Sequence, residues 1–170
     1  MSGAVQRLPF ETFQTVVEHA PLVAIDFIVK DLATNTCLLG KRRFPPAKGM
    51  LFTPGGRIYK NERYECALRR LLREELGSGL EHAQVSFHGV YEHLYEESSV
   101  DGKLGTHYVV HVVRVDVDKL EGVDDAFRVQ HDDAVWLGAG DIVGSDLVHS
   151  NCKDYFVRGS STEIFRNVIS

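Results

Sequence analysis

The residues best suited to chemistry lie between Pro54 and Gly77, in the segment PGGRIYKNERYECALRRLLREELG. Placed on a helix from about Glu62, at roughly 100° per residue, this segment has one apolar face. That face consists of Tyr64, Ala67, Leu68, Leu71, Leu72 and Leu76. Glu75 projects from its middle, where a carboxylate is destabilising unless it is paired or binds a metal. The Gly-Gly pair upstream lets backbone approach a phosphate or an ion, so the segment predicts a metal–phosphate site.

The same segment resembles the Nudix box, which reads Gly, five residues, Glu, seven residues, then Arg-Glu-apolar-any-Glu-Glu-any-Gly-apolar. The matching positions are Gly56, Glu62, Arg70, Leu71, Leu72, Arg73, Glu74, Glu75, Leu76, Gly77 and Ser78. Two of them depart from the pattern, because Leu71 stands at the first helical Glu and Ser78 replaces the closing apolar residue. Ordinary Nudix pyrophosphatases use that first carboxylate in their metal cluster. The Leu71 departure therefore counts against the usual multi-metal attack at phosphorus.

From the amino-terminal helix to about Phe156, the chain resembles the GDP-mannose mannosyl hydrolase branch of this family. The matching pieces are PLVAIDFIV, LLGKR, PAKG, PGGR, THYVV, QHDDAVWL and VHSNCKDYF. That branch also tends to lack the Glu at the Leu71 position and carries Gln-His late in the chain, here Gln130 and His131. The resemblance implies hydrolysis of GDP-mannose, or a relative such as GDP-glucose, to GDP and free hexose. In this branch water attacks the anomeric carbon with inversion.

The resemblance implies a Mg²⁺ cofactor, for which Mn²⁺ can substitute. Mg²⁺ prefers oxygen ligands and keeps several waters. Its expected ligands are Glu75, the Gln130 side chain and the Gly55 carbonyl, which leave positions for a diphosphate. Glu74 is either a second ligand, directly or through water, or a solvated helix charge.

His131 is the expected general base, because an imidazole that titrates near neutrality can take a proton from water. Read without the resemblance, it is a histidine of a surface loop. Asp132 and Asp133 either orient His131 or cap the turn. His93 is the next candidate for the base.

Guanidinium groups near the box are expected to bind the diphosphate. Arg42 and Arg57 flank the segment, and their forks match phosphate oxygens and stabilise charge on a departing diphosphate. Arg70 either contacts phosphate or holds Glu75 in place.

Four further positions resemble substrate contacts of the branch. Asp26, His93 and Tyr108 match positions that contact the sugar or the leaving group. Asp26 also interrupts an apolar strand, where a carboxylate requires a partner. Phe13 matches an aromatic side chain that contacts the guanine, and core packing is its alternative.

The composition excludes several classes of protein. The 170 residues and 44% hydrophobic content suit one domain with a core, and the net charge of -5 argues against a broad nucleic-acid surface. The chain has no run of about 18 apolar residues that could span a membrane, and its start, MSGAVQRLPFETF, lacks a secretory pattern. Three cysteines without a CxxC spacing fit a reducing compartment, so we expect a cytoplasmic protein.

The patterns predict an α/β fold, a Nudix-type α/β/α sandwich with a mixed central sheet, as one domain over residues 1–170. The expected helices cover about 10–20, the box, and the tail after Asp141. The expected strands are Leu22–Lys30, Cys37–Gly40, 84–96, Thr106–Val117 and Ala134–Leu137, with loops at 43–50 and 98–105. Because the branch is dimeric, the first helix is expected to dock on a second chain in a homodimer.

Two other functions stay open. A Nudix pyrophosphatase would cleave a nucleoside diphosphate derivative at phosphorus; the Glu74–Glu75 pair favours it, whereas Leu71 and the Gln-His pair disfavour it. A silent nucleotide-sugar sensor on the same fold is disfavoured by the presence of Glu75, Gln130 and His131.

Overall fold

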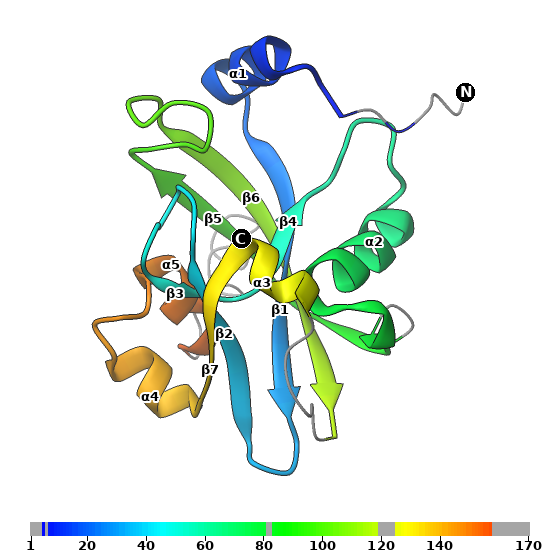
Figure 1. Cartoon of the computed structure of the whole chain (residues 1–170), viewed down its shortest axis with the longest axis vertical. Helices are drawn as coiled ribbons and strands as arrows, with labels where there is room; N and C mark the ends of the chain where they lie inside the picture. The colour runs from blue at the N-terminus through cyan, green and yellow to red at the C-terminus, as the bar shows by residue number, and fades with distance from the viewer. Residues whose placement is uncertain (1–4, 6, 81–82, 119–124, 158–170) are drawn as a thin grey trace, which may run out of the picture.

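The computed structural model describes residues 5, 7–80, 83–118 and 125–157. Figure 1 shows strands at the centre and helices around them. In chain order the elements are α1 (Phe10–His19), β1 (Leu22–Asp31), β2 (Thr36–Arg42), β3 (Leu51–Phe52), β4 (Gly55–Arg57), α2 (Tyr64–Leu76), η1 (Ser78–Leu80), β5 (Val85–Tyr95), β6 (Thr106–Val117), α3 (Asp125–Gln130), β7 (His131–Leu137), α4 (Ala139–Gly144), α5 (Ser150–Lys153) and η2 (Asp154–Phe156).

The strands form one mixed sheet with the order β3-β2-β1-β6-β5. β1 and β6 run parallel, and every other pairing is antiparallel. β1 changes partner along its length, because its first half pairs with β4 and its last two residues pair with β2. This change of partner leaves the Gly-Gly turn of β4 beside Asp26, in register with Gly55.

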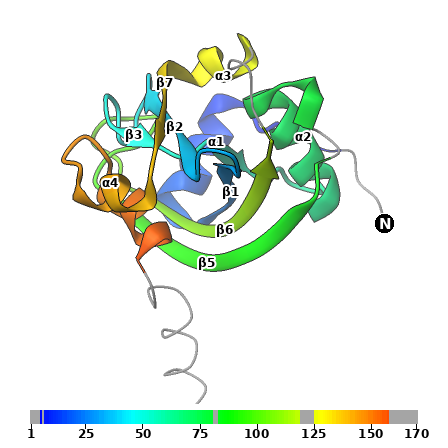
Figure 2. The same ribbon diagram turned by 90° about the horizontal axis from the view of Figure 1, so that it is seen from below.

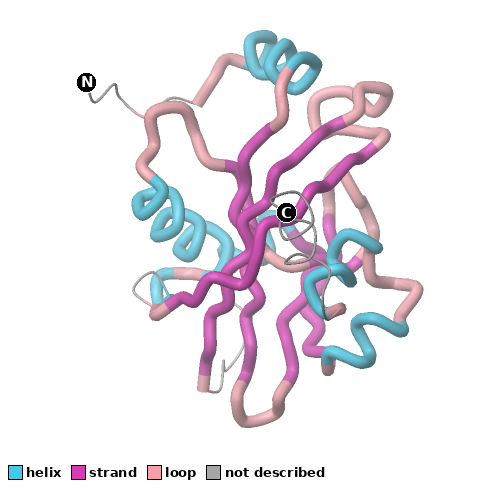
Figure 3. Tube along the Cα trace, turned by 180° about the vertical axis from the view of Figure 1, so that it is seen from behind, coloured by secondary structure: helices cyan, strands magenta, loops and turns pink. Residues whose placement is uncertain are grey.

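Two apolar cores cover the two faces of the sheet. One lies under α2 and α3 and includes Phe27, Leu72 and Phe127. The other lies under α4, α5 and η2 and includes Phe52, Ile142 and Tyr155. Figures 2 and 3 show α2 and α4 on opposite sides of the strands. The predicted sandwich with a mixed central sheet is confirmed.

Helix α2 buries the face that the 3.6-residue period predicts. Its buried residues are Ala67, Leu71, Leu72, Glu75 and Leu76, and it ends at Gly77 with a φ of 94°, a left-handed conformation that glycine adopts readily. The prediction was wrong for Tyr64, which is 40% exposed. Tyr64 opens the helix at the rim, where its ring meets His111.

The sequence patterns missed some short elements. β3 has two residues and β4 has three, including two glycines, so neither shows an alternating pattern. α3 was also missed, and β7 begins at His131, three residues before the predicted start. The predicted tail helices correspond to α4, α5 and η2, and residues 158–170 lie outside the described part of the chain.

Within the described residues, no helix is long and apolar enough to cross a membrane. Cys37, Cys66 and Cys152 are all free thiols.

Candidate active site

A cavity of about 460 Å³ opens beside the Gly-Gly turn. It lies between α1, β1, β4, α2 and the 43–50 loop. All but one of the predicted site residues line it: Phe13, Asp26, Arg42, Gly55, Arg57, Arg70, Glu74, Glu75, His93, Tyr108 and Gln130. The exception is His131.

Glu75 is the carboxylate buried deepest on the helix side of this cavity. Its side chain lies in the apolar face of α2, and the residue is only 4% exposed. One oxygen, Oε1, accepts a long hydrogen bond of 3.4 Å from Gln130 Nε2. Oε2 is buried and has no hydrogen-bond partner among the described residues. Burial raises the pKa of Glu75 to about 7, so this position would gain from a bound cation.

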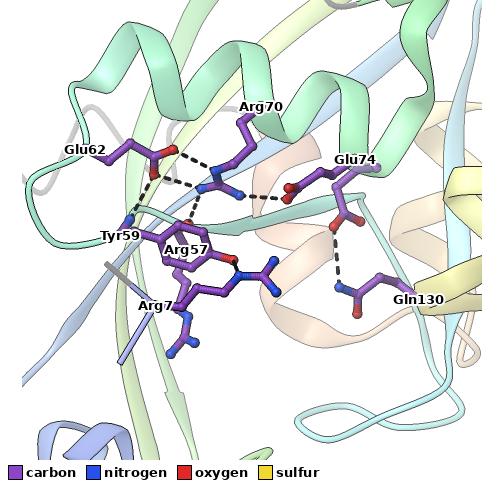
Figure 4. Close-up of polar contacts among 8 residues, drawn as sticks. Arg7, Arg57, Tyr59, Glu62, Arg70, Glu74 and Gln130 are labelled. Atoms are coloured by element: carbon purple, nitrogen blue, oxygen red, sulfur yellow. Dashed lines mark hydrogen bonds and ion pairs between the residues drawn. The ribbon is translucent and has the colours of Figure 1, made fainter. Parts of the chain in front are cut away.

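Arg70 connects α2 to the turn before it. It forms a bidentate ion pair with Glu62, with distances of 2.6 and 2.8 Å, and a second ion pair of 2.8 Å with Glu74. It also donates to the Arg57 carbonyl (Figure 4). Hydrogen bonding from Arg70 lowers the pKa of Glu62. Arg70 therefore holds the loop before α2 and Glu74 in place. One of its two predicted roles was to hold Glu75, and the ion pair is with Glu74 instead.

Arg42 and Arg57 present their guanidinium groups to the cavity without an ion pair to any described residue. The Nε of Arg42 is buried and has no hydrogen-bond partner in the described chain. The Arg57 guanidinium lies 3.5 Å from the centre of the Phe13 ring. Phe13 thus stacks on a cavity arginine from α1. An anion in the cavity would meet both guanidinium groups.

Arg7 is a cavity residue that the sequence did not reveal. Its Nε donates to the Tyr59 hydroxyl at 3.1 Å, and its guanidinium lies 5.3 Å from the centre of that ring. Arg70 covers the same ring at 4.1 Å. No motif surrounds Arg7, so only the fold brings it to the site.

Asp26 and His93 meet through a third side chain, Tyr155. The Tyr155 hydroxyl donates to Asp26 Oδ2 at 2.6 Å and lies 3.0 Å from His93 Nε2. All three residues are buried. Burial raises the pKa of Asp26 to about 6 and lowers that of His93 to about 3. Tyr155 was also missed, although it lies in the VHSNCKDYF piece.

Tyr108 borders the same end of the cavity. It follows Thr106, the first residue of β6, by two positions, and its ring meets that of Tyr95 edge-on at 6.2 Å. Burial raises the pKa of the Tyr108 hydroxyl, so the neutral phenol is the form that faces a ligand.

His131 lies in the core rather than in a surface loop. It is 2% exposed, its ring stacks on Phe127 at 4.2 Å, and it lies so close to Gly40 that a side chain at that position would meet the ring. Its Nδ1 is 3.1 Å from the Phe127 carbonyl. Burial lowers the pKa of His131 to about 4, so the expectation of titration near neutrality was wrong.

The two aspartates after His131 are engaged elsewhere. Asp132 forms a 2.9 Å ion pair with Arg43. Asp133 accepts a hydrogen bond from the Ala134 amide within β7, so it does not cap a turn. Neither contact orients the His131 ring.

A metal at this site would depend on few side chains. The described ranges contain no group of three or more His, Cys, Asp or Glu that could hold a metal. Glu75, with one unpartnered buried oxygen, still fits a cation that takes its remaining ligands from amide or backbone oxygens, water and phosphate. Gln130 contacts Glu75 through its nitrogen here, and the ion pair with Arg70 engages Glu74.

The family model of the NUDIX domain matches residues 21–156. The chain belongs to the Nudix family. It is a Nudix hydrolase, and members of this family generally use divalent metal ions. The low-salt glycan biosynthesis protein Agl8 of Haloferax volcanii is 37% identical over 117 residues, which are 68% of this chain and 72% of Agl8.

Solved structures agree on the fold. The MutT protein from Methanosarcina mazei Go1 superposes with a TM-score of 0.62 at 15% identity, over 89% of this chain and 99% of that one. The E. coli dihydroneopterin triphosphate pyrophosphohydrolase superposes with a TM-score of 0.64 at 16% identity, over 79% of this chain and 91% of that one. The NUDIX domain of Shewanella oneidensis NrtR, complexed with ADP ribose, superposes with a TM-score of 0.54 at 16% identity, over 89% of this chain and 90% of that one.

The burial of Asp26 predicts a gain in stability when its charge is removed. The folded-state pKa of about 6 exceeds the ordinary 3.8, so the folded protein holds the Asp26 proton more tightly and loses stability as pH rises from about 4 to 6. Above that window we expect Asp26→Asn to increase the free energy of unfolding by roughly 1–3 kcal/mol. Below about pH 4 the gain should disappear.

Urea denaturation in EDTA at several pH values measures this difference. Asp146→Asn is the matched control, because Asp146 is exposed. If Asp26→Asn were less stable than the wild type by the same free energy of unfolding at every pH, the electrostatic explanation would be contradicted.

Proposed function

We propose that this Nudix hydrolase cleaves a GDP-sugar, GDP-mannose or a relative such as GDP-glucose, to GDP and free hexose with one Mg²⁺. The main evidence is which carboxylates of the Nudix box are present and which of them have a free oxygen. Leu71 is buried where the first helical Glu would stand, and Arg70 engages Glu74. Glu75 is left as the box carboxylate with an unpartnered oxygen, which supports a single-metal site rather than a cluster for attack at phosphorus.

The ligands of the metal would be Glu75, the Gly55 carbonyl and the Gln130 side chain, if its amide turns its oxygen inward. When bound, the ion neutralises charge on the leaving diphosphate. Arg42 and Arg57 donate to the same diphosphate, and their two guanidinium groups stabilise the charge that builds on GDP as the glycosidic bond breaks. Both line the cavity, and neither forms an ion pair with a described carboxylate.

Two histidines are candidates for the base that deprotonates the attacking water. The resemblance to the GDP-mannose branch favours His131, which is neutral at pH 7 but buried beside the cavity wall. The geometry favours His93, which lines the cavity. We propose His131 as the base and His93 as the alternative.

The sugar would lie toward Asp26, His93 and Tyr108, which border one end of the cavity, and Phe13 would contact the base. The name of Agl8, a glycan biosynthesis protein, supports a sugar-linked substrate.

Incubation with a panel of nucleotide sugars and Mg²⁺ in ¹⁸O-water tests the reaction. We expect a GDP-sugar to be the best substrate and the label to enter the hexose. Label in a phosphate product would instead establish a Nudix pyrophosphatase, which the presence of both Glu74 and Glu75 in the cavity favours. No turnover of any nucleotide sugar would favour a sensor.

Glu75→Gln should reduce kcat by orders of magnitude, because the amide keeps the shape but loses the charge that binds the metal. Mn²⁺ binding, measured by electron paramagnetic resonance, should weaken in parallel, and the fold should survive. The control is Glu65→Gln on the same helix, since Glu65 is exposed and pairs with Arg69. Turnover like that of the wild type at saturating Mg²⁺ would exclude Glu75 as the principal ligand.

His131→Gln should lower kcat by at least ~10²-fold, the usual scale for a lost general base. A base with a pKa of about 4 is active above that pH and loses activity as pH falls through it. The acidic limb of the wild-type profile should therefore lie near pH 4 and vanish in the variant. His93→Gln is measured alongside. If only His93→Gln removes the rate, His93 is the base.

The protein is proposed to be a homodimer that docks through α1, which stands at one end of the sheet and exposes Phe10 to 61% (Figure 1). We expect light scattering at micromolar concentration to give a dimer that Phe10→Asp dissociates. Phe87→Asp is the control, because Phe87 is 69% exposed on β5, away from that helix. A wild-type monomer at that concentration would reject the assembly.

A further inference from the structure

Tyr155 touches two cavity residues without lining the cavity itself. It comes from η2, 129 positions after Asp26, and is 2% exposed. Its ring stacks on His93 with centroids 5.6 Å apart and meets Tyr91 at 4.7 Å. Its carbonyl contacts His88 Nε2 at 2.8 Å. The packing fixes the hydroxyl between Asp26 and His93.

The hydrogen bonds of this hydroxyl have a defined direction. A phenol carries one proton, and Tyr155 donates it to Asp26 Oδ2 at 2.6 Å. The 3.0 Å contact with His93 Nε2 must then be a bond in which Nε2–H donates to the Tyr155 oxygen. Because neutral imidazole has one N–H, Nδ1 of His93 is left unprotonated.

The unprotonated nitrogen of His93, Nδ1, lies near the hydroxyl of Tyr95, another residue that lines the cavity. Nδ1 of His93 lies 3.4 Å from the Tyr95 hydroxyl, and Tyr95 and His93 both line the cavity. A lone pair there accepts a hydrogen bond from Tyr95 or from a hydroxyl of a ligand. The opposite tautomer would present an N–H, which can only donate.

We propose that Tyr155 is a positioning residue that holds Asp26 as a hydrogen-bond acceptor and fixes His93 as the Nε2–H tautomer, so that His93 presents its Nδ1 lone pair to a hydroxyl in the cavity. The inference depends on the proposed function in one respect: the hydroxyl that donates to Nδ1 is taken to belong to the sugar or to the attacking water. Removing the Tyr155 hydroxyl leaves the buried Nε2–H of His93 without its acceptor.

The tautomer can be measured directly. Protein labelled with ¹⁵N-histidine is studied by long-range ¹H–¹⁵N NMR at about pH 8, and His93→Gln assigns the His93 signals among the eight histidines. We expect the Nε2–H tautomer in the wild type and its loss in Tyr155→Phe, which keeps the ring but lacks the hydroxyl. Tyr91→Phe is the matched control, because it removes a hydroxyl from the same aromatic cluster, and it should leave the tautomer unchanged.

Kinetics give an independent readout. With the best GDP-sugar, Tyr155→Phe should lower kcat at least ~10-fold and change KM less than ~3-fold, the size expected for a hydrogen bond to a charged or reacting group. Tyr91→Phe should retain the wild-type kcat. A purely structural role would instead lower the melting temperature without changing the His93 spectrum of the folded protein.

Two results would overturn the inference. One is an Nδ1–H tautomer of His93 in the wild type, a measurement that stands even if Tyr155→Phe does not fold. The other is a Tyr155→Phe protein that keeps both tautomer and kcat. If the tautomer depends on Tyr155 but no nucleotide sugar is hydrolysed, the positioning role stands and the proposed function fails.

Discussion

The bidentate ion pair between Arg70 and Glu62 is the contact on which the site depends. Glu62 is almost completely buried in this pair and also accepts a hydrogen bond from the Tyr59 amide. Arg70 reaches in turn to the Arg57 carbonyl. Helix α2 and strand β4 are thereby fixed to each other, and this connection sets where Glu75 lies relative to Gly55. Breaking one partner of such a buried pair leaves a charge without compensation.

The cavity gathers charges that the free protein only partly neutralises. Asp26 and Glu75 are buried carboxylates with raised pKa values, and the charge of Asp26 contributes to the raised pKa of Glu75. Arg42 has a buried nitrogen without a partner in the described chain. Such an arrangement lowers the stability of the fold, which the two apolar cores offset. An anion and a cation that enter together would satisfy both sets of groups.

Strand and helix patterns predicted most of the fold, and the resemblance to the GDP-mannose branch supplied many of the predicted residues that line the cavity, including Asp26, His93 and Tyr108. Ala67, Leu72 and Glu75 are buried on α2 as expected, because local spacing decides which face a helix presents. His131 was misjudged because its neighbours are polar, whereas its burial depends on Phe127 and on the absence of a side chain at Gly40. Arg7 and Tyr155 reach the site only through tertiary packing, which no local pattern encodes.

The bond between Asp26 and Tyr155 also bears on how the protein is made. A contact that spans 129 positions is a long-range closure, and such closures carry a large entropic penalty and form slowly. During synthesis β1 leaves the ribosome long before η2, because the amino-terminal part of a chain emerges first. Asp26 therefore stays without its tyrosine partner until nearly the whole fold has emerged. Chains arrested before Tyr155 would carry helix α2 and the arginines, yet lack the hydroxyl that contacts Asp26 and His93.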